Sequence, residues 1–292
     1  MDLTEDFLDY LRYERNYSPL TVENYSRDLA SFQEFAGSQE ESILAADSDM
    51  VRGWMESMMD RGLAATTINR RLSTARTFFR FALARGLVER NPAHVVEGPR
   101  KRKPLPVFVR EKEMDELLEQ SRWGDNYKDV RARTLLLLFY STGIRLAELI
   151  GLDDAMVDFA TREMRVTGKR DKQRIIPFGE ELATALKAYI ALRDDNVPRQ
   201  CNALFVTPDG QRMNAGKVRY EVQKALAKVT TLSKRSPHVL RHTFATAMLN
   251  HGAGLESVKK LLGHESLSTT EIYTHATFEQ LKRIYNSAHP RA

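Results

Sequence analysis

The sequence predicts a mainly α-helical protein with two domains, the second of which contains a small antiparallel β-sheet. Residues 1–97 show only the apolar spacing of helices, whereas the rest of the chain also contains one pair of adjacent strand patterns. Residues 98–107 are rich in proline and in like charges, a composition that favours an extended linker. Because 292 residues exceed one typical domain, we expect domains at 1–97 and 108–292 on either side of this linker.

Four helices are expected in the first domain. A short apolar run includes Phe7 and Leu11, and a longer one follows the helix start at Ser18–Pro19. A third run covers residues 48–61, and a fourth covers residues 66–85. Each repeats apolar residues every three or four positions, so all four can share one core.

The fourth helix carries five arginines and no acidic residue. A charged helix face opposite an apolar stripe is commonly just a solvated surface. The absence of acidic residues instead favours contact with phosphate groups, and the basic linker is suited to lying along a nucleic-acid backbone. A plain solvated linker is the alternative. The residues assigned to DNA binding on these grounds are Arg70, Arg71, Arg76, Arg100, Lys101, Arg102 and Lys103.

The second domain is expected to combine helices with one β-hairpin. The apolar helix at 129–140 has the composition of a buried element, and Arg145 opens the helix that follows it. Strand patterns at 163–167 and 173–178 are joined by a short basic segment, which predicts a hairpin with Lys169 at its turn. Further helices are expected at residues 110–120, 145–149, 179–193, 216–230, 237–250 and 255–262.

A helix start in the last third of the chain predicts an anion site. Ser236 is expected to cap this helix, and Pro237 suits its first position. His238 and Arg241 are three residues apart, so they share one face of the first turn. That turn already carries positive potential from its free N–H groups.

The following segment brings a phenol to the same region. A helix is expected to stop at Gly263 and to leave His264 in a loop. Residues 268–271 have the pattern of a capping box, which would place Tyr273 in the second turn of a short helix. The two segments together predict an anion site that faces a nucleophile.

The residue types at these positions suit displacement at phosphorus. Arginine forks bind phosphate oxygens in pairs and stay charged, and preplaced donors stabilise the charge that develops in an in-line reaction. A tyrosine with a free pKa of about 10 needs a base and a positive field to become a nucleophile. Lysine suits protonation of a leaving alkoxide, and Glu148 is expected to orient Arg145 through a salt bridge. The candidate catalytic residues are Arg145, Lys169, His238, Arg241, His264 and Tyr273.

These motifs resemble those of the tyrosine recombinase (phage-integrase-like) family, and within it the bacterial Xer recombinases. They are Thr-Gly-Ile-Arg-Leu-Ala-Glu-Leu around Arg145, Gly-Lys at Lys169, His-x-x-Arg at His238, Leu-Leu-Gly-His at His264, and Tyr273. The resemblance spans the whole chain. It implies a SAM-like core-binding domain that binds DNA, the linker, and a catalytic domain whose terminal helix is exchanged between protomers.

The resemblance also implies the reaction and the role of each residue. Tyr273 would attack the scissile phosphate of a recombination site in double-stranded DNA and form a 3′-phosphotyrosyl link. His238 would be the general base and Lys169 the general acid to the 5′-oxygen. No cofactor and no metal would be needed, because the covalent link keeps the bond energy. The phosphate oxygens would be held by Arg145, Arg241 and His264.

Partners follow from the same resemblance. The enzyme would assemble as a homo- or hetero-tetramer on DNA through the exchanged C-terminal helix, with a second Xer recombinase and a cell-division accessory protein as further partners. It would resolve chromosome dimers at replication termini. The alternatives are an integrase of a phage or mobile element and, in a different class, a catalytically silent DNA-binding protein. A type IB topoisomerase shares the chemistry, but the Xer-like tail Ala-His-Pro-Arg-Ala at residues 288–292 and the N-terminal domain do not fit it.

Composition limits the remaining classes. A net charge of +5 and a pI of about 9.2 are compatible with a nucleic-acid partner. The single cysteine, Cys201, excludes a disulfide framework. His238 and His242 have a spacing seen in zinc helices, but no glutamate or cysteine accompanies them, so we expect no metal. No signal peptide and no membrane span are predicted, and a cytoplasmic location is expected.

The last helix is predicted to act on a neighbouring protomer. Residues 277–280 have a capping-box pattern, so a helix is expected from Phe278 to about Asn286. Its apolar stripe includes Leu281 and Tyr285, which one peripheral helix can hardly bury on its own domain.

Overall fold

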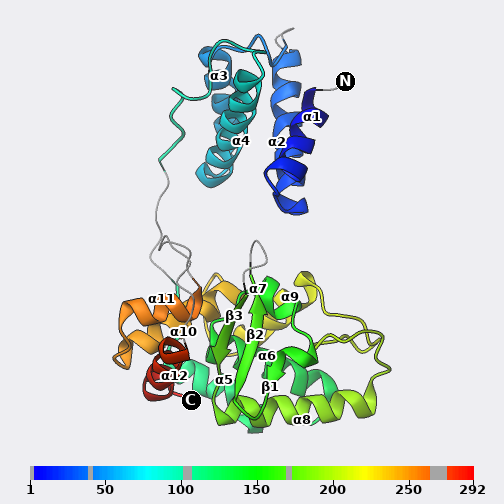
Figure 1. Ribbon diagram of the computed structural model, residues 1–292, viewed down its shortest axis with the longest axis vertical. Coiled ribbons are helices and arrows are strands. Elements are labelled where there is room, and N and C mark those ends of the chain that lie inside the picture. Colours follow the sequence, from blue (N-terminus) through cyan, green and yellow to red (C-terminus); the bar gives the residue numbers. More distant parts are fainter. Residues whose placement is uncertain (1–2, 39–41, 101–106, 169–172, 264–274) are drawn as a thin grey trace. The chain divides into compact units, whose positions relative to one another are not determined.

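The computed structural model describes residues 3–38, 42–100, 107–168, 173–263 and 275–292, with the side chains of the last range given from residue 278 onward. The chain divides into two compact units, Met1–Pro104 and Leu105–Ala292 (Figure 1). Both are mainly helical, which confirms the predicted fold class. Across the described ranges, none of the helices combines the length and the apolar character that crossing a membrane requires.

The first unit is a helical bundle around an aromatic core. Phe7 packs edge to face on Phe78 with ring centroids 5.4 Å apart, and the rings of Phe32 and Trp54 lie 4.7 Å apart. All four are buried, as their helical spacing predicts. The described helices are α1 (Leu3–Asp9), the π-helical segment η1 (Tyr10–Glu14), α2 (Pro19–Ser38), α3 (Ser48–Asp60) and α4 (Ala65–Ala84).

The chain that follows α4 is fastened back onto that helix. We call residues 91–99 the strap. The Asn69 amide donates to the Pro99 carbonyl over 2.8 Å, and Arg76 Nε donates to the Ala93 carbonyl over 3.1 Å. A Cβ on Gly98 would lie 2.5 Å from Asn69 Oδ1, so a side chain at this position would displace the Asn69 amide from its present place. The segment expected to be a free linker from residue 98 is therefore held on α4 as far as Pro99.

The second unit is built around α6 (Tyr127–Thr142), whose residues from Thr134 onward are all buried. This helix packs against α8 and α10, and both are visible beside it in Figure 1. Its apolar character on every side is the reason it occupies the centre. The other described elements before the sheet and after it are α5 (Glu111–Leu118), η2 (Gln120–Arg122), α7 (Leu146–Ile150), η3 (Asp154–Met156), α8 (Glu180–Asn196) and α9 (Ala215–Leu226).

A three-stranded antiparallel sheet lies on one side of this unit, in the order β1 (Val157–Asp158), β2 (Glu163–Thr167) and β3 (Gln173–Pro177). The predicted hairpin strands are confirmed, whereas β1 was missed because it is only two residues long. Val166 pairs with Arg174 and Met164 pairs with Ile176. Since alternate residues share a face, Arg174 lies on the same side as the buried Ile176.

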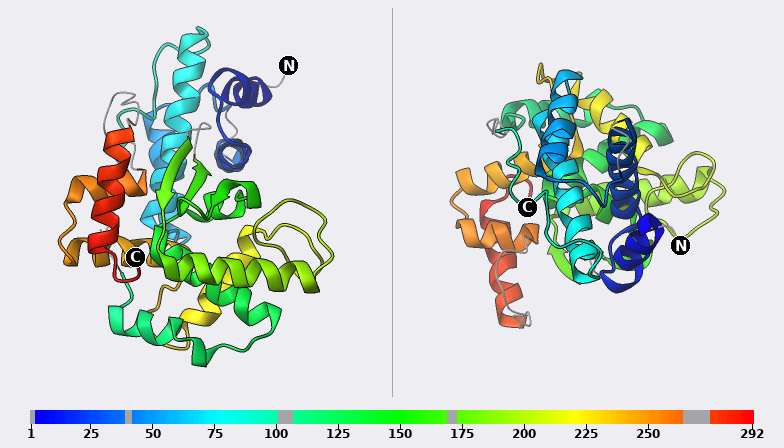
Figure 2. Two further views of the ribbon diagram at one scale, coloured as in Figure 1. Left: turned by 60° about the horizontal axis from the view of Figure 1, so that its bottom comes forward. Right: turned by 90° about the horizontal axis from the view of Figure 1, so that it is seen from above.

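Three helices close the unit: α10 (Pro237–Asn250), α11 (Leu255–Leu262) and α12 (His275–Ala288). They lie side by side in Figures 1 and 2. Leu281 and Tyr285 of α12 are buried in a cluster with Phe244 and Met248 of α10. The expectation that this apolar stripe cannot be buried on its own domain is therefore wrong, and the helix also begins three residues before the predicted start.

The residues after α12 are anchored to the same unit. His289 is buried, and its ring stacks on that of Tyr285 with centroids 5.3 Å apart. Arg291 donates to both carboxylate oxygens of Glu181, over 2.7 and 2.8 Å, and to Asp115 over 2.8 Å. These contacts hold α12 in place from its C-terminal end.

Candidate active site

Arg145 is positioned by the turn between α6 and α7. Gly143 ends α6 with a φ of +59°, and a Cβ there would lie 2.5 Å from Phe244, so the turn requires glycine. Arg145 then takes the N-cap position of α7. Its backbone N–H donates to Glu148 Oε2 and its Nη1 donates to Glu148 Oε1, both over 2.8 Å. The predicted salt bridge between Glu148 and Arg145 is confirmed.

Arg241 reaches the same place from α10. Its Nη2 donates to the Leu262 carbonyl over 2.6 Å, while Arg145 Nη2 donates to the Gly263 carbonyl over 2.7 Å. The two guanidinium groups are thus held by consecutive carbonyls at the C-terminal end of α11, where the helix dipole is negative. The Arg145 side chain is 37% exposed, whereas Arg241 is only 8% exposed. Arg145 is therefore accessible to solvent, whereas Arg241 is buried at the same site.

A third arginine, Arg174, completes the cluster. It forms a bidentate pair with Glu148, whose side chain is 2% exposed. Three guanidinium groups and one carboxylate leave an excess of two positive charges. Burial raises the pKa of Glu148, but the hydrogen bonds and charges of Arg174 and Arg145 outweigh it and lower the pKa to about 2. Burial, followed by the charges of Arg145 and Arg174, lowers the pKa of Arg241 to about 10, so it stays charged at neutral pH.

His238 lies at the exposed start of α10. Desolvation, and then the charges of Lys234 and Arg241, lower its pKa, so the ring is neutral at pH 7 and can accept a proton. Ser236 takes the predicted N-cap position and Pro237 the first helical position, but the Ser236 hydroxyl makes no capping hydrogen bond. The predicted side-chain cap is therefore wrong. The N–H groups of this turn are left without that acceptor, which adds to the positive potential.

Other predicted residues lie outside the described residues. They are Lys169, His264 and Tyr273 of the catalytic set, and Lys101, Arg102 and Lys103 of the linker. Within the described ranges, the structure brings Arg145 and Arg241 together and places His238 within electrostatic reach of Arg241. The two arginines can hold a phosphate group, and the neutral ring of His238 can accept a proton from a nucleophile that attacks it.

Comparison with known proteins identifies the family of this chain. The family described as "Phage integrase family" matches residues 107–280, and "Phage integrase, N-terminal SAM-like domain" matches residues 4–86. Tyrosine recombinase XerC of Pelotomaculum thermopropionicum is 39% identical over 300 residues, covering 99% of this chain and 98% of that protein. Tyrosine recombinase XerC of Bacillus subtilis is 38% identical over 296 residues, covering 98% and 95%. This chain belongs to the phage integrase family of tyrosine recombinases.

Solved structures share the recombinase fold. The XerH site-specific recombinase bound to a palindromic difH substrate has a TM-score of 0.74 at 22% identity, covering 96% of this chain and 83% of that one. The XerA recombinase has a TM-score of 0.50 at 26% identity, covering 100% and 99%.

Sequence reasoning missed Arg174 as a residue of the site. The signal that could have found it is the alternation of β3, because Arg174 occupies a position of the same parity as the apolar Ile176. An arginine on the buried face of a strand needs a partner. The partner, Glu148, lies 26 residues away in the sequence, so no local pattern reveals the pair.

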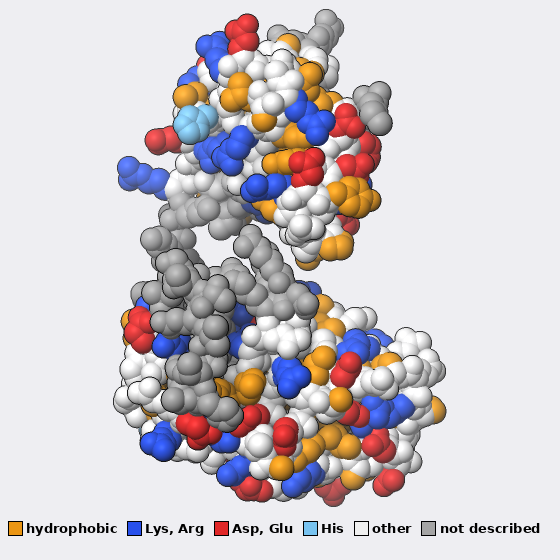
Figure 3. Space-filling view, viewed as in Figure 1, with side chains coloured by type: hydrophobic (Ala, Val, Ile, Leu, Met, Phe, Trp, Pro, Cys, Tyr) orange, Lys and Arg blue, Asp and Glu red, His pale blue; other side chains and the backbone are white. Residues whose placement is uncertain are grey.

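The arginines of α4 in this recombinase are less free than their sequence suggests. Asp28 of α2 is buried and forms ion pairs with Arg70 and Arg71, and it accepts a hydrogen bond from Thr74 over 2.9 Å. The argument from the absence of acidic residues counted only those within the helix, whereas the carboxylate comes from a neighbouring one. Arg76 is committed to carbonyls of the strap. Several Lys and Arg side chains still lie close together on the visible face of this unit (Figure 3).

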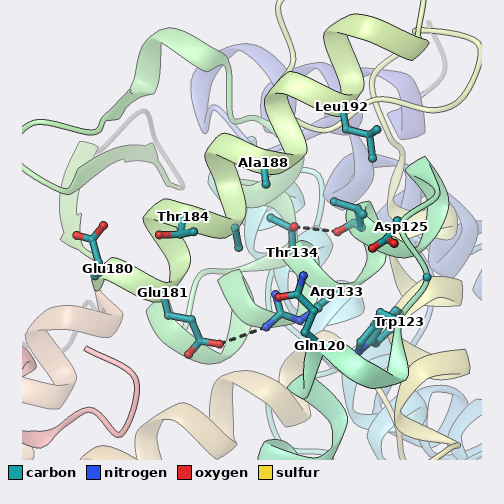
Figure 4. Close-up of a pocket in the computed structure, with 13 residues that line it drawn as sticks. Gln120, Trp123, Asp125, Arg133, Thr134, Glu180, Glu181, Thr184, Ala188 and Leu192 are labelled. Atoms are coloured by element: carbon teal, nitrogen blue, oxygen red, sulfur yellow. Dashed lines mark hydrogen bonds and ion pairs between the residues drawn. The ribbon is translucent and has the colours of Figure 1, made fainter.

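A cavity of about 490 Å³ lies between η2, α6 and α8 (Figure 4). Trp123 and Leu192 contribute apolar walls, and Arg133 at its edge lies 3.4 Å from Glu181. The cavity contains no residue of the predicted catalytic set. Nor do three or more His, Cys, Asp or Glu side chains gather as a metal site in the described part of the chain.

Proposed function

We propose that this recombinase cuts and rejoins double-stranded DNA at a specific recombination site through a 3′-phosphotyrosyl intermediate. The observation that carries the proposal is the pair Arg145 and Arg241, held on the consecutive carbonyls of Leu262 and Gly263. The cluster around this pair has two more positive charges than negative ones. A phosphodiester, which gains negative charge as it is attacked, matches such a site better than a neutral substrate does.

In the proposed reaction each proton that is released has a named acceptor, and each proton that is needed has a named donor. The Tyr273 oxygen forms a bond to phosphorus, the bond from phosphorus to the 5′-oxygen breaks, and the phenolic proton passes to His238. Lys169 donates a proton to the departing 5′-oxygen. Rejoining reverses these steps, since the phosphotyrosyl bond replaces the phosphodiester bond without hydrolysis. The neutral state of His238, favoured by its lowered pKa, supports its role as base.

We propose further that four protomers assemble on two DNA duplexes and that the physiological reaction resolves chromosome dimers. In the structure the chain's own α12 occupies this surface of α10 through Leu281 and Tyr285, so in the assembly α12 would have to leave it and the terminal helix of a neighbour would take its place. A contact of that head-to-tail kind closes into a ring. The proposed protein partners are a second Xer recombinase and a cell-division accessory protein. Arg70 and Arg100 are proposed to bind the DNA backbone.

Removal of the Tyr273 oxygen tests the chemistry. On a nicked DNA target, where the cleaved fragment is lost and the adduct accumulates, we expect the wild-type protein to form a covalent protein–DNA complex and Tyr273→Phe to form none. DNA binding should be unchanged. Tyr13→Phe is the matched control, because it removes the same atom from an exposed ring of the first unit. A covalent complex with Tyr273→Phe would overturn the assignment.

The same assay separates the alternatives. A catalytically silent DNA-binding protein would bind the target and yield no covalent complex with the wild-type chain. An integrase of a phage or mobile element would form the complex, but its footprint on chromosomal DNA would map to the end of an inserted element. A footprint near the replication terminus is the result expected for dimer resolution.

A further inference from the structure

Arg174 is the third arginine of the site, and it takes no part in the proposed reaction. It comes from β3, and its side chain is 10% exposed. Its Nη2 donates to Glu148 Oε2 over 2.8 Å and its Nη1 donates to Glu148 Oε1. Glu148 in turn binds the backbone N–H and the Nη1 of Arg145. One buried carboxylate therefore joins two arginines from different elements.

Arg174 also supports the turn that Arg145 and Arg241 grip. A Cβ on Gly263 would lie 3.1–3.3 Å from Cδ, Nε and Cζ of Arg174, so the guanidinium is packed directly against this glycine. Its Nε is buried and has no hydrogen-bond partner among the described residues. Gly263 has a φ of +66°. A side chain at this position would meet both backbone strain and the arginine.

We infer that Arg174 is a positioning residue of the phosphate site: it holds and neutralises Glu148, so that Glu148 orients Arg145 without cancelling its charge. The inference rests on the proposed function, because the phosphate is the group for which Arg145 is kept available. Arg174 itself packs against Gly263 and is 10% exposed, so it acts through Glu148 and not by contact with DNA.

The charges of the cluster give the reason. With Arg174 present, the carboxylate of Glu148 has a bidentate partner of its own, and the cluster keeps two positive charges for the phosphate. Without it, Arg145 is the nearest cation to a buried carboxylate, and a buried charge draws its only partner close. The cluster then keeps a single excess positive charge. The phosphate loses both charge and the oriented fork of Arg145.

Two variants test whether Arg174 balances the charge of Glu148. We expect Arg174→Gln to lower the single-turnover cleavage rate by ~10²–10³, the effect of losing one preorganised donor. Arg174→Gln combined with Glu148→Gln restores the excess of two charges, and the amide oxygen introduced by Glu148→Gln can still accept a hydrogen bond from Arg145. The double variant should therefore cleave faster than Arg174→Gln alone. Arg122→Gln is the matched control, since it removes the same charge from an exposed ion pair of the same unit.

A methylphosphonate at the scissile position gives a second readout. This linkage lacks the negative charge of a phosphodiester, so it depends less on the excess positive charge of the site. We expect the defect of Arg174→Gln to shrink on it, whereas a loss that is merely structural would persist on both substrates. Melting temperatures of the three variants show whether each is folded.

The outcomes distinguish this inference from the proposed function. If the wild-type chain forms no covalent complex with DNA, the proposed function fails. If the wild-type chain cleaves and Arg174→Gln cleaves at the same rate, the positioning role of Arg174 is wrong. If Arg174→Gln does not fold, the double variant provides the test, because it removes both partners of the ion pair together. The positioning role of Arg174 is then wrong if the double variant cleaves the phosphodiester far more slowly than wild type and is equally slow on the methylphosphonate.

Discussion

Arg145 and Arg241 grip neighbouring carbonyls, but they differ in what surrounds them. Arg241 donates to the carbonyls of Gly143 and Leu262 and thereby joins the ends of α6 and α11. Arg145 is more exposed, and a second arginine shares its carboxylate partner. A phosphate contact is proposed for both arginines, and Arg241 in addition stabilises the fold. The two roles can be separated by measurement.

We expect Arg145→Lys and Arg241→Lys each to lower the cleavage rate by ~10²–10³, because lysine keeps the charge and loses the fork. Arg241→Lys should in addition lower the melting temperature, since one ammonium group cannot replace both carbonyl bonds at a buried position. Single-turnover cleavage and thermal unfolding of both variants check this. Near-normal cleavage by either variant would mean that other residues hold the phosphate. Equal melting temperatures of the two variants would contradict the structural role of Arg241.

At this scale the sequence was informative where partners are close along the chain. Glu148 and Arg145 are three residues apart, so helix geometry predicts their pairing. Arg70 and Asp28 are 42 residues apart, and their pairing depends on how α2 packs on α4. Packing of this kind has no local signature, which is why the basic face of α4 looked freer than it is.

Among the elements, α12 departs most from expectation. Its apolar stripe predicts a partner, but periodicity does not say which molecule provides it. In the structure, α10 and α11 provide it, and the buried ring of His289 secures the end. Nε2–H of this ring donates to the Tyr140 carbonyl over 3.1 Å, and Nδ1 accepts from the Arg291 N–H over 3.0 Å. The ring must be neutral to make both bonds.

This gives α12 a defined dependence on pH. Burial, and then the charges of Arg291 and His251, lower the pKa of His289 from 6.5 to about 4 despite the bond to Tyr140. Because the docked state binds fewer protons than the open state, docking is strongest above pH 6.5 and weakens as the pH falls toward 4. Between pH 7 and pH 5 we expect the free energy of opening α12 to fall by about 2 kcal/mol. Hydrogen exchange of residues 278–288 measures it.

The control for this prediction is His289→Gln, which can make a hydrogen bond to Tyr140 but does not titrate. Its α12 should lose far less protection between the two pH values than the wild-type helix does. The same change in protection for both proteins would show that another group controls the docking.

For the whole molecule, the net charge of +5 is small, so binding of DNA depends on where cations are free. We expect Arg100→Gln to flatten the log–log salt dependence of binding by ~0.9, the value for one phosphate contact. Arg76→Gln should leave the slope unchanged, because the guanidinium of Arg76 is bound to carbonyls of the strap. Binding constants between low and moderate salt provide the test. A flatter slope for Arg76→Gln would mean that DNA displaces the strap.

The excess positive charge of the cluster of Arg145, Arg174, Arg241 and Glu148 has a consequence for storage of the protein. Like charges at close quarters repel one another, so any anion that binds between them shifts the equilibrium toward the native state by mass action. Phosphate or sulfate in a storage buffer should thus prolong the life of the protein. The same ions would occupy the place proposed for the scissile phosphate and would compete with DNA. We therefore expect the salt that best preserves the recombinase also to inhibit it, so that rates measured in different buffers would report on the anion as well as on the enzyme.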